Sequence, residues 1–474
     1  MIRLAGSMIG RAALVLACLA HVGAADEPRP NIILIVADDL GYGHLGRYGQ
    51  TKIRTPHIDR MAAEGITFTH FYSGCAVCAP SRSVLMTGLH MGHTPIRWNG
   101  GGTSLADKDV TIAEVLRSAG YVCGGFGKWG LGVENSPGHP MRQGFDHFFG
   151  YLHQVHAHFF YPYWLWSDES RHALSGNEGG RRGQYSHDEI MREALDFIRQ
   201  NHERPFFCYL PATLPHVELA VPEDSVAPYR GEFSEIVLDD PREGYIDPAE
   251  PLATFAGMIS RLDDGVGRVL ALIRELGLDE RTLVMFTSDN GAQGDTWRPL
   301  IDFFDGTAGL RANKGTLYEG GIRVPMVARW PRKIAANRVS DLQATFCDVL
   351  PTLAEVAGAA PPDGIDGVSL LPTLLGHEDQ KRHEYLYWEH YLGTSGAAPM
   401  IQAVRAGDWM LVRPKASAAW ELYDLSADPA EKVDLASRRP DVVERLAAYA
   451  ESAHQPPREH ADDAPRTTYR DYVR

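Results

Sequence analysis

Short apolar runs alternate with longer segments of helical periodicity along most of the chain. Residues 31–37 (NIILIVA) form a continuous apolar run, which is typical of a strand buried on both faces of a parallel sheet. Residues 282–288 (TLVMFTS) predict a second strand. From residue 252 to 276, apolar side chains recur at helical spacing, and Gly277 follows as a stop signal. The alternation predicts an α/β fold with a mainly parallel central sheet flanked by helices.

Other elements of the same kind can be placed between these landmarks. Thr55 and Pro56 predict a helix start, with Thr55 as the N-cap and Pro56 in the first turn, and Gly65 predicts its end. Further strands are expected at residues 121–126, 206–210 and 324–330, and a further helix at residues 347–357.

The pattern changes after about residue 375, where short strands follow one another without helices between them. Residues 385–390, 402–413 and 420–425 predict strands, and residues 441–453 predict a helix. We therefore expect a small antiparallel sheet with one helix. The expected division is a signal peptide at 1–25, a catalytic α/β domain at 26–375, and a small α+β subdomain with a tail at 376–474.

The first 25 residues resemble an export signal. Arg3 and Arg11 precede or flank an apolar stretch from Ala12 to Val22, and small residues follow it. The stretch is short for a membrane span, which needs about 20 residues. We expect an exported protein, periplasmic or extracellular, with no membrane span; a retained anchor or a lipoprotein signal ending at Cys18 are the alternatives.

Composition narrows the function classes. The chain has 474 residues with 44% hydrophobic and 23% charged, which is typical of a folded globular protein. A net charge of −15 argues against nucleic acid as a partner, although a few local cations suffice for an anionic substrate.

The cysteine count is odd after the signal is removed. Removing Cys18 with the signal leaves five of six cysteines, so at least one stays unpaired in an oxidising compartment.

Two pairs of residues with oxygen-bearing side chains follow predicted strands. Asp38 and Asp39 come after the first strand, and Asp289 and Asn290 come after residues 282–288. Ligand sites of open α/β sheets lie at the carboxyl ends of strands, so the pairs can converge on one point. Their oxygen atoms suit Ca²⁺ or Mg²⁺. The alternative is that both pairs are simple turns.

The segment Cys78-Ala79-Pro80-Ser81-Arg82 is the second candidate for chemistry. Pro80 fits the first turn of a helix, which places Cys78 near the helix N-terminus, where free N–H groups attract anions. The alternative is a buried structural cysteine.

This segment, extended to Met86-Thr87-Gly88, resembles the signature of the type I sulfatases of the alkaline phosphatase superfamily. Other matches follow in the order of that family: Asp38-Asp39-Leu40-Gly41-Tyr42-Gly43, Gly127-Lys128-Trp129, Pro215-His216, Ser288-Asp289-Asn290-Gly291, the segment from Lys314 through Glu319 and Arg323 to Pro325, the segment starting at Asp348, and Leu422-Tyr423-Asp424-Leu425. The resemblance covers most of the chain after the signal.

The resemblance implies that a dedicated enzyme, a formylglycine-generating enzyme or a maturase, converts Cys78 into Cα-formylglycine. It also implies that Asp38, Asp39, Asp289, Asn290 and the modified residue 78 bind Ca²⁺, with Mg²⁺ as the alternative. One hydroxyl of the hydrated aldehyde would attack sulfur, and the second would then expel sulfate. Cys78 would therefore not remain a thiol.

The same resemblance assigns roles to four further side chains. Arg82 would orient the hydrated aldehyde, and Lys128 would contact both it and the sulfate. Lys314 would bind the sulfate or the leaving oxygen. His216 would face the leaving group, as a hydrogen-bond donor or general acid together with Lys314.

One departure from the family pattern concerns residue 130. Many members have a histidine there that is thought to act as a base in sulfate release, whereas this chain has Gly130, which has no side chain. His156 or His158, in an aromatic stretch, are the candidates for a replacement base or a substrate contact. Packing of these histidines within a loop is the alternative.

The expected function is hydrolysis of sulfate esters, with carbohydrate O-sulfates as the expected substrates and aryl sulfates as model substrates. The partners would be a sulfated small molecule or glycan and the modifying enzyme. Two alternatives stay open: a phosphonate monoester or phosphodiester hydrolase of the same superfamily, and a catalytically silent binding protein.

Overall fold

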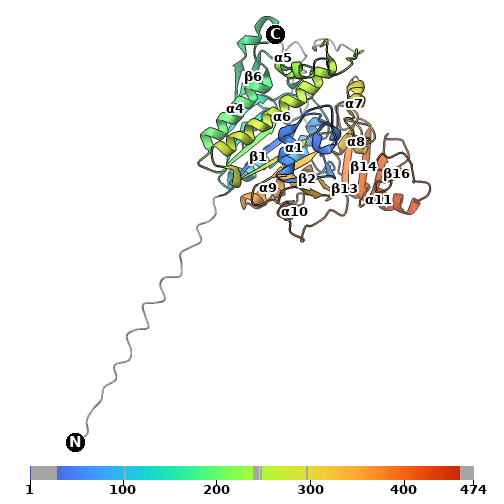
Figure 1. The fold of residues 1–474 in the computed structure, drawn as a ribbon. Helices are drawn as coiled ribbons and strands as arrows, with labels where there is room; N and C mark the ends of the chain where they lie inside the picture. The colour runs from blue at the N-terminus through green and yellow to red at the C-terminus, as the bar shows by residue number, and fades with distance from the viewer. Residues whose placement is uncertain (2–28, 101–102, 239–244, 246–247, 295–296, 459–474) are drawn as a thin grey trace.

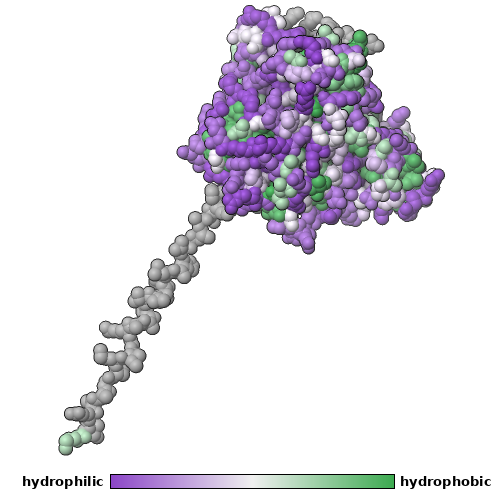
Figure 2. Space-filling view, viewed as in Figure 1, coloured by the Kyte–Doolittle hydropathy of each residue, from purple (hydrophilic) through white to green (hydrophobic). Residues whose placement is uncertain are grey.

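The computed structural model describes residues 1, 29–100, 103–238, 245, 248–294 and 297–458. The expected signal peptide, apart from Met1, and the end of the tail lie outside this part of the chain. No helix within these ranges is both long and apolar enough to cross a membrane. The face of the molecule in Figure 2 is mostly hydrophilic, and its apolar side chains form small separate groups.

A ten-stranded mixed sheet forms the centre of the molecule (Figure 1). In spatial order its strands are β11 (Arg338–Ser340), β2 (Ile66–Phe68), β10 (Met326–Arg329), β9 (Thr282–Ser288), β1 (Asn31–Ala37), β8 (Phe206–Pro211), β4 (Val122–Lys128), β5 (His147–Tyr151), β6 (Trp164–Ser167) and β7 (Ser170–Ala173). The five strands from β9 to β5 are parallel. The neighbours β10, β6 and β7 pair antiparallel. The prediction of a mainly parallel α/β sheet is confirmed.

Helices cover both faces of this sheet. One face carries α1 (Pro56–Ala63), α4 (Ser186–Asn201) and α6 (Pro251–Glu275), and the other carries α2 (Cys78–Thr87), α3 (Ile112–Ser118) and α9 (Val349–Ala357). Figure 1 shows α4 and α6 side by side across the sheet. In β1, Ile33 and Ile35 join the first apolar layer, whereas Ile32 and Leu34 join the second. This double burial explains the unbroken apolar run of β1.

Several short elements complete the larger part of the molecule. They are β3 (Phe71–Tyr72), which pairs with β12 (Ala344–Thr345), and the helices α5 (Glu223–Val226), α7 (Arg298–Phe304), α8 (Glu319–Ile322) and α10 (Leu371–Leu375). The helix expected at residues 347–357 starts as a 3₁₀ turn over Phe346–Asp348 and continues as α9.

A second, four-stranded antiparallel sheet consists of β13 (Leu386–Tyr391), β14 (Met400–Ala406), β15 (Trp409–Arg413) and β16 (Glu421–Asp424). The helix α11 (Pro440–Ala453) packs on it, which confirms the predicted sheet with one helix. The single strand expected at residues 402–413 is instead a hairpin. Gly407, with φ of +59°, provides the turn between β14 and β15.

The N-terminus of α1 is capped differently from the sequence expectation. Thr55 precedes the helix, but its side chain accepts no hydrogen bond from the first turn. Instead, the Asp263 carboxylate of α6 accepts hydrogen bonds from the backbone N–H groups of His57, at 3.1 Å, and Ile58, at 2.7 Å. A long-range contact between α1 and α6 therefore replaces the local cap.

Two buried carboxyl groups, Glu319 and Glu431, lie where the segment between β16 and α11 meets α8. The Glu431 carboxyl accepts a hydrogen bond from the backbone N–H of Glu319 at 2.9 Å. Burial, together with the nearby Glu319 carboxyl, raises the pKa of Glu431 to about 9. The folded protein therefore keeps a proton that the unfolded chain loses near pH 4.5. The free energy of unfolding therefore falls as the pH rises from 4.5 to about 9, because the folded state binds more protons than the unfolded chain over that range.

We predict that Glu431→Gln, which keeps the residue neutral and retains an acceptor for the Glu319 N–H, reduces this loss. Wild type and variant should melt at similar temperatures at pH 5, and the variant should melt roughly 2 °C or more above wild type at pH 8.5. Thermal melts across pH measure the difference. The exposed Glu378→Gln serves as the control. A melting difference that does not grow with pH would contradict the prediction.

Candidate active site

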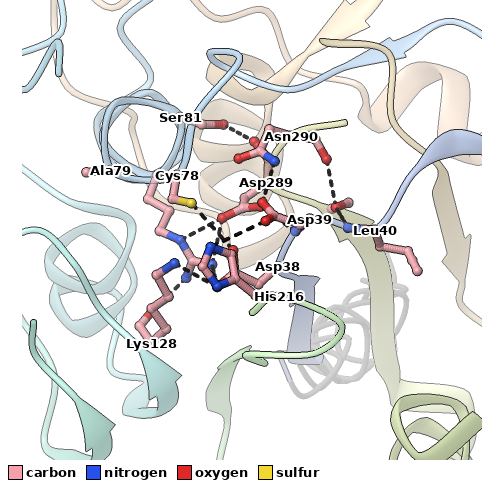
Figure 3. Close-up of polar contacts among 12 residues, drawn as sticks. Asp38, Asp39, Leu40, Cys78, Ala79, Ser81, Lys128, His216, Asp289 and Asn290 are labelled. Carbon is pink, nitrogen blue, oxygen red and sulfur yellow. Dashed lines mark hydrogen bonds and ion pairs between the residues drawn. The ribbon is translucent and has the colours of Figure 1, made fainter. Parts of the chain in front are cut away.

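The candidate site lies at the carboxyl ends of the parallel strands (Figure 3). Asp38 and Asp39 follow β1, and Asp289 and Asn290 follow β9, the neighbouring parallel strand. The Asn290 side-chain amide donates a hydrogen bond to Asp39 Oδ1 at 2.7 Å. The Asp39 backbone N–H donates to Asp289 Oδ1 at 3.2 Å. The two pairs therefore converge, because their strands lie in register side by side.

Cys78 is the first residue of α2 and points towards these carboxylates (Figure 3). Its Sγ lies 3.5 Å from Asp38 Oδ1 and 3.5 Å from Lys314 Nζ. Ser81 fixes the start of the helix, since its hydroxyl donates to the backbone oxygen of Asp289 at 2.5 Å. The side chain of Asn99 accepts from the backbone N–H of Ala79 at 2.9 Å. Cys78 is thus held at a helix N-terminus, as the sequence predicts.

Three cations pair with the three carboxylates. Arg82 donates to Asp289 Oδ2 through Nε at 3.0 Å and Nη2 at 2.7 Å. Lys128, the last residue of β4, lies with its Nζ 2.7 Å from Asp38 Oδ2. Lys314 Nζ lies 2.7 Å from Asp39 Oδ2. Arg82 also donates to the backbone oxygen of Lys128 at 2.6 Å, so it ties two of these pairs together.

The loop that carries Lys314 is anchored to both neighbouring loops. The Lys314 backbone N–H donates to the Ala292 oxygen at 3.0 Å, and the Gly315 N–H donates to the Ala76 oxygen at 2.9 Å. Lys314 is therefore positioned relative to the Asp289 loop and the Cys78 loop at once.

Burial and charge set the protonation states of the site. Burial alone would raise the pKa of Asp38, but nearby cations such as Lys128 and Arg82 hold it well below its usual value. Burial raises the pKa of Asp39 to about 6, although Lys314 opposes this. Burial also raises the pKa of the Cys78 thiol to about 12. At neutral pH, Asp38 is ionised and an unmodified Cys78 is a protonated thiol.

His216, in the turn after β8, completes the group of buried polar residues. Its Nε2 lies 3.1 Å from Lys314 Nζ, and its Nδ1 lies 2.9 Å from the backbone oxygen of Val217. Burial holds the pKa of His216 well below its usual value, and Lys314 and Lys128 add to this effect. The contacts favour a neutral imidazole that accepts a hydrogen bond from Lys314 at Nε2 and donates one from Nδ1 to the Val217 oxygen.

The donor set fits a hard divalent cation. Ligand atoms of Asp38, Asp39, Cys78 and His216 lie within 4.8 Å of one another. Asn290 Oδ1 is buried and has no hydrogen-bond partner among the residues that the structure describes. Three carboxylates and one such amide oxygen are the ligands that Ca²⁺ and Mg²⁺ prefer.

A cavity of about 270 Å³ opens beside Cys78. Its polar lining comes from Asn99, His153, Gln154, His158, His216, Gln293 and Lys314. Neither Asn99, Gln154 nor Gln293 was expected from the sequence, since no motif contains them. Gly130, which has no side chain and lies next to Gln154, is a sequence signal that could have indicated this amide.

The two candidate histidines differ in placement, although both lie in one 3₁₀ turn, η4 (His156–His158). The His158 ring lies 4.6 Å from the His216 ring, and its Nδ1 lies 2.7 Å from the Tyr245 hydroxyl. The His156 ring is buried 4.3 Å from the Trp164 ring and does not line the cavity. The structure thus brings His158, and not His156, to the site.

Buried cations and carboxylates surround Cys78 at the end of a parallel sheet, and this arrangement fits a hydrolase of anionic esters. Residues 30–359 match the family model described as Sulfatase, and residues 310–450 match the one described as N-sulphoglucosamine sulphohydrolase, C-terminal. The chain belongs to the sulfatase family and is a sulfuric ester hydrolase.

Individual relatives agree with this result. The chain is 34% identical to arylsulfatase A of Homo sapiens over 494 residues, which covers 90% of this chain and 87% of the relative. It is 32% identical to N-acetylgalactosamine-6-sulfatase of Canis lupus familiaris, which covers 79% and 72%. A solved Bacteroides thetaiotaomicron structure, titled for the metabolism of multiple glycosaminoglycans, matches with a TM-score of 0.74, 27% identity, and 90% and 99% coverage.

We predict that Asn290→Ala weakens the response of the protein to Ca²⁺. After chelation, adding Ca²⁺ at about 100 times its Kd should stabilise wild type by about 2.7 kcal/mol, seen as a rise in melting temperature. The variant should lose most of that rise at the same concentration, because one oxygen ligand is gone. Comparing each protein with and without Ca²⁺ separates this effect from any loss of folding stability.

The exposed acid variant Asp363→Ala is the matched control and should respond to Ca²⁺ like wild type. An unchanged Ca²⁺ response in Asn290→Ala would show that this amide is not a ligand.

Proposed function

We propose that the protein is an exported sulfatase, periplasmic or extracellular, that removes O-sulfate groups from carbohydrates with a Cα-formylglycine formed from Cys78 and a bound Ca²⁺. The observation that carries the proposal is the position of Cys78 Sγ, 3.5 Å from both the Asp38 carboxylate and the Lys314 ammonium. An oxygen nucleophile at that point lies between a metal-ligand carboxylate and a cation.

The state of the cysteine supports its modification. A thiol with a pKa of about 12 is protonated at neutral pH and is a poor nucleophile. When formylglycine is present, its hydrated aldehyde supplies an attacking hydroxyl and a second hydroxyl for sulfate release. The modifying enzyme, a formylglycine-generating enzyme or a maturase, is thus a required partner.

Charge supports the choice of an anionic ester. Asp38, Asp39 and Asp289 formally balance Arg82, Lys128 and Lys314, and a divalent cation bound to the carboxylates would make the site positive and polarise the sulfuryl oxygens. Lys128 and Lys314 then bind the sulfate group. Arg82 acts as a positioning residue through Asp289 and the Lys128 backbone.

The proton for the leaving oxygen is held on Lys314. Burial would lower its pKa, but the Asp39 carboxylate raises it above its usual value, so the ammonium stays charged. Neutral His216 accepts a hydrogen bond from Lys314 and keeps the ammonium directed into the cavity. Lys314 is therefore the acid, and His216 orients it.

His158 is our proposed base for sulfate release. Burial, with Lys128 and Lys314 nearby, holds the pKa of His158 well below its usual value, so the imidazole is neutral and can accept a proton. Its Nδ1 is held by the Tyr245 hydroxyl at 2.7 Å, which fixes the ring above His216. His156 packs against aromatic rings, and we assign it no chemical role.

The carbohydrate part of the proposal rests on the cavity and on the relatives. A space of about 270 Å³ with amide and imidazole walls suits one polar ring more than an extended apolar ligand. One relative is named for a sulfated amino sugar, and one structural neighbour for glycosaminoglycan metabolism. A terminal sulfated sugar is thus the proposed substrate.

The test is to produce the protein together with a formylglycine-generating enzyme. Mass analysis of the peptide that contains Cys78 should show the loss expected when CH₂SH becomes CHO. The converted protein should hydrolyse 4-nitrophenyl sulfate and sulfated sugars, and Cys78→Ala should not.

Two outcomes would contradict the proposal. Faster hydrolysis of a phosphonate monoester than of the sulfate would favour a phosphonate hydrolase. Complete conversion of Cys78 without turnover of any sulfate ester would favour a silent binding protein.

We predict that His158→Ala releases about one equivalent of 4-nitrophenol per site quickly and then turns over slowly. The kcat should fall about 100-fold or more, because general base catalysis typically accelerates a step by roughly 10²- to 10⁴-fold. Stopped-flow absorbance measures both phases. The partly exposed His202→Ala, at the end of α4, is the control, and a His158→Ala variant with wild-type kcat would remove His158 from the mechanism.

A further inference from the structure

The backbone beyond β4 continues beside the chain that leaves β5. The Trp129 N–H donates to the Tyr151 oxygen at 2.8 Å, and the Gly130 N–H donates to the Leu152 oxygen at 3.1 Å. Gly130 has a φ of +77°, a conformation that side chains of L-residues disfavour. Residue 130 is thus held close to the start of the segment that follows β5.

Gln154 fills the space next to Gly130. A Cβ built on Gly130 would lie 2.1 Å from Gln154 Nε2 and 3.0 Å from its Cδ, and its three nearest heavy atoms all belong to Gln154. Real side chains do not approach this closely. A side chain at residue 130 therefore cannot coexist with the Gln154 amide in its present position, and one of the two would have to move.

The Gln154 amide is an unused donor at the wall of the active-site cavity. Its Nε2 is buried and makes no hydrogen bond to any residue in the described ranges. Gln154 lines the same cavity as Cys78, His158 and Lys314. A buried donor without a partner is unfavourable, so a ligand that supplies an acceptor would remove that cost.

We propose that Gln154 is a substrate-binding residue, whose Nε2–H donates a hydrogen bond to a sulfuryl oxygen of the ester bound over residue 78. A sulfate ester offers acceptor oxygens and no donors, which matches an amide N–H and two lysine ammonium groups. The Gln154 amide is neutral and cannot take up a proton. On the wall of the cavity next to Gly130, sulfate binding is therefore separate from proton transfer. The inference rests on the proposed position of the sulfate group and not on the sugar.

The same contact gives Gly130 a specific purpose. Any larger residue would force Gln154 out of the cavity and would adopt a strained φ. Gly130 and Gln154 are therefore one unit, in which the missing side chain makes room for the donor.

The test compares Gln154→Leu and Gln154→Glu with wild type on 4-nitrophenyl sulfate, whose hydrolysis needs no sugar contact. Gln154→Leu should lower kcat/KM about 10- to 100-fold, the effect of one hydrogen bond to a charged group. Gln154→Glu should lower it further through charge repulsion. The inhibition constant of inorganic sulfate should rise in both variants, and the melting temperature of Gln154→Leu should not fall, because no protein partner is lost.

Gly130→Ala tests the coupling. It should also lower kcat/KM, and the double variant with Gln154→Leu should be little worse than the more impaired single variant, because both remove the same contact. Gln343→Leu, whose amide bonds to the Gly407 oxygen in the second sheet, is the control and should retain wild-type kcat/KM.

Retention of kcat/KM within about twofold in Gln154→Leu and Gln154→Glu, with an unchanged sulfate inhibition constant, would overturn the proposal. Failure of Cys78 to convert would be a separate result. In that case, calorimetric binding of inorganic sulfate to the unconverted wild type and variants still tests Gln154. Equal sulfate affinity in all of them would also overturn the proposal.

Discussion

The site depends on one constraint, which is the mutual neutralisation of charges that have no access to water. Asp38, Asp39 and Asp289 are at most 1% exposed, and Arg82 and Lys128 are fully buried. A buried ion is tolerable only when paired and hydrogen-bonded, and removing one partner leaves an uncompensated charge. Arg82 bonds both to Asp289 and to the strand end that carries Lys128, so the pairs are not independent. The site is therefore a single electrostatic unit.

The second sheet holds this unit in place from outside. Trp388 of β13 donates through Nε1 to the Ser73 oxygen at 2.9 Å, and the apolar side chains of this face pack on Leu317 and Ala76. The loops of Cys78 and Lys314 are thus pressed against one apolar surface. Within the described residues, the second sheet places no side chain around the cavity. Its close packing against the loops of Cys78 and Lys314 is explained by this supporting role.

The sequence predicted those features whose cause is local or strongly periodic. β1 and β9 were placed correctly because burial on both faces leaves an unbroken apolar run, and the Asp38 and Asp289 pairs followed from the rule for strand ends. Features that depend on distant packing were not predictable. Asp263, and not Thr55, caps α1. A single residue, Ala157, separates His156 from His158, yet only the tertiary packing of the aromatic segment decides which one lines the cavity. The amide of Gln154 occupies the space beside Gly130 through a loop whose path no sequence rule describes.

The large sequence separation of the site residues determines when the site can form during synthesis and folding. The Asn290 amide reaches Asp39 across 251 residues, and the loop of Cys78 is closed by a strand that begins at residue 386. The site cannot assemble until nearly the whole chain has been made. Once assembled, it leaves Cys78 only 2% exposed, beneath a cavity too small for another protein. Any enzyme that alters this cysteine must therefore bind the segment around it while that segment is unfolded, and so must act before folding is complete.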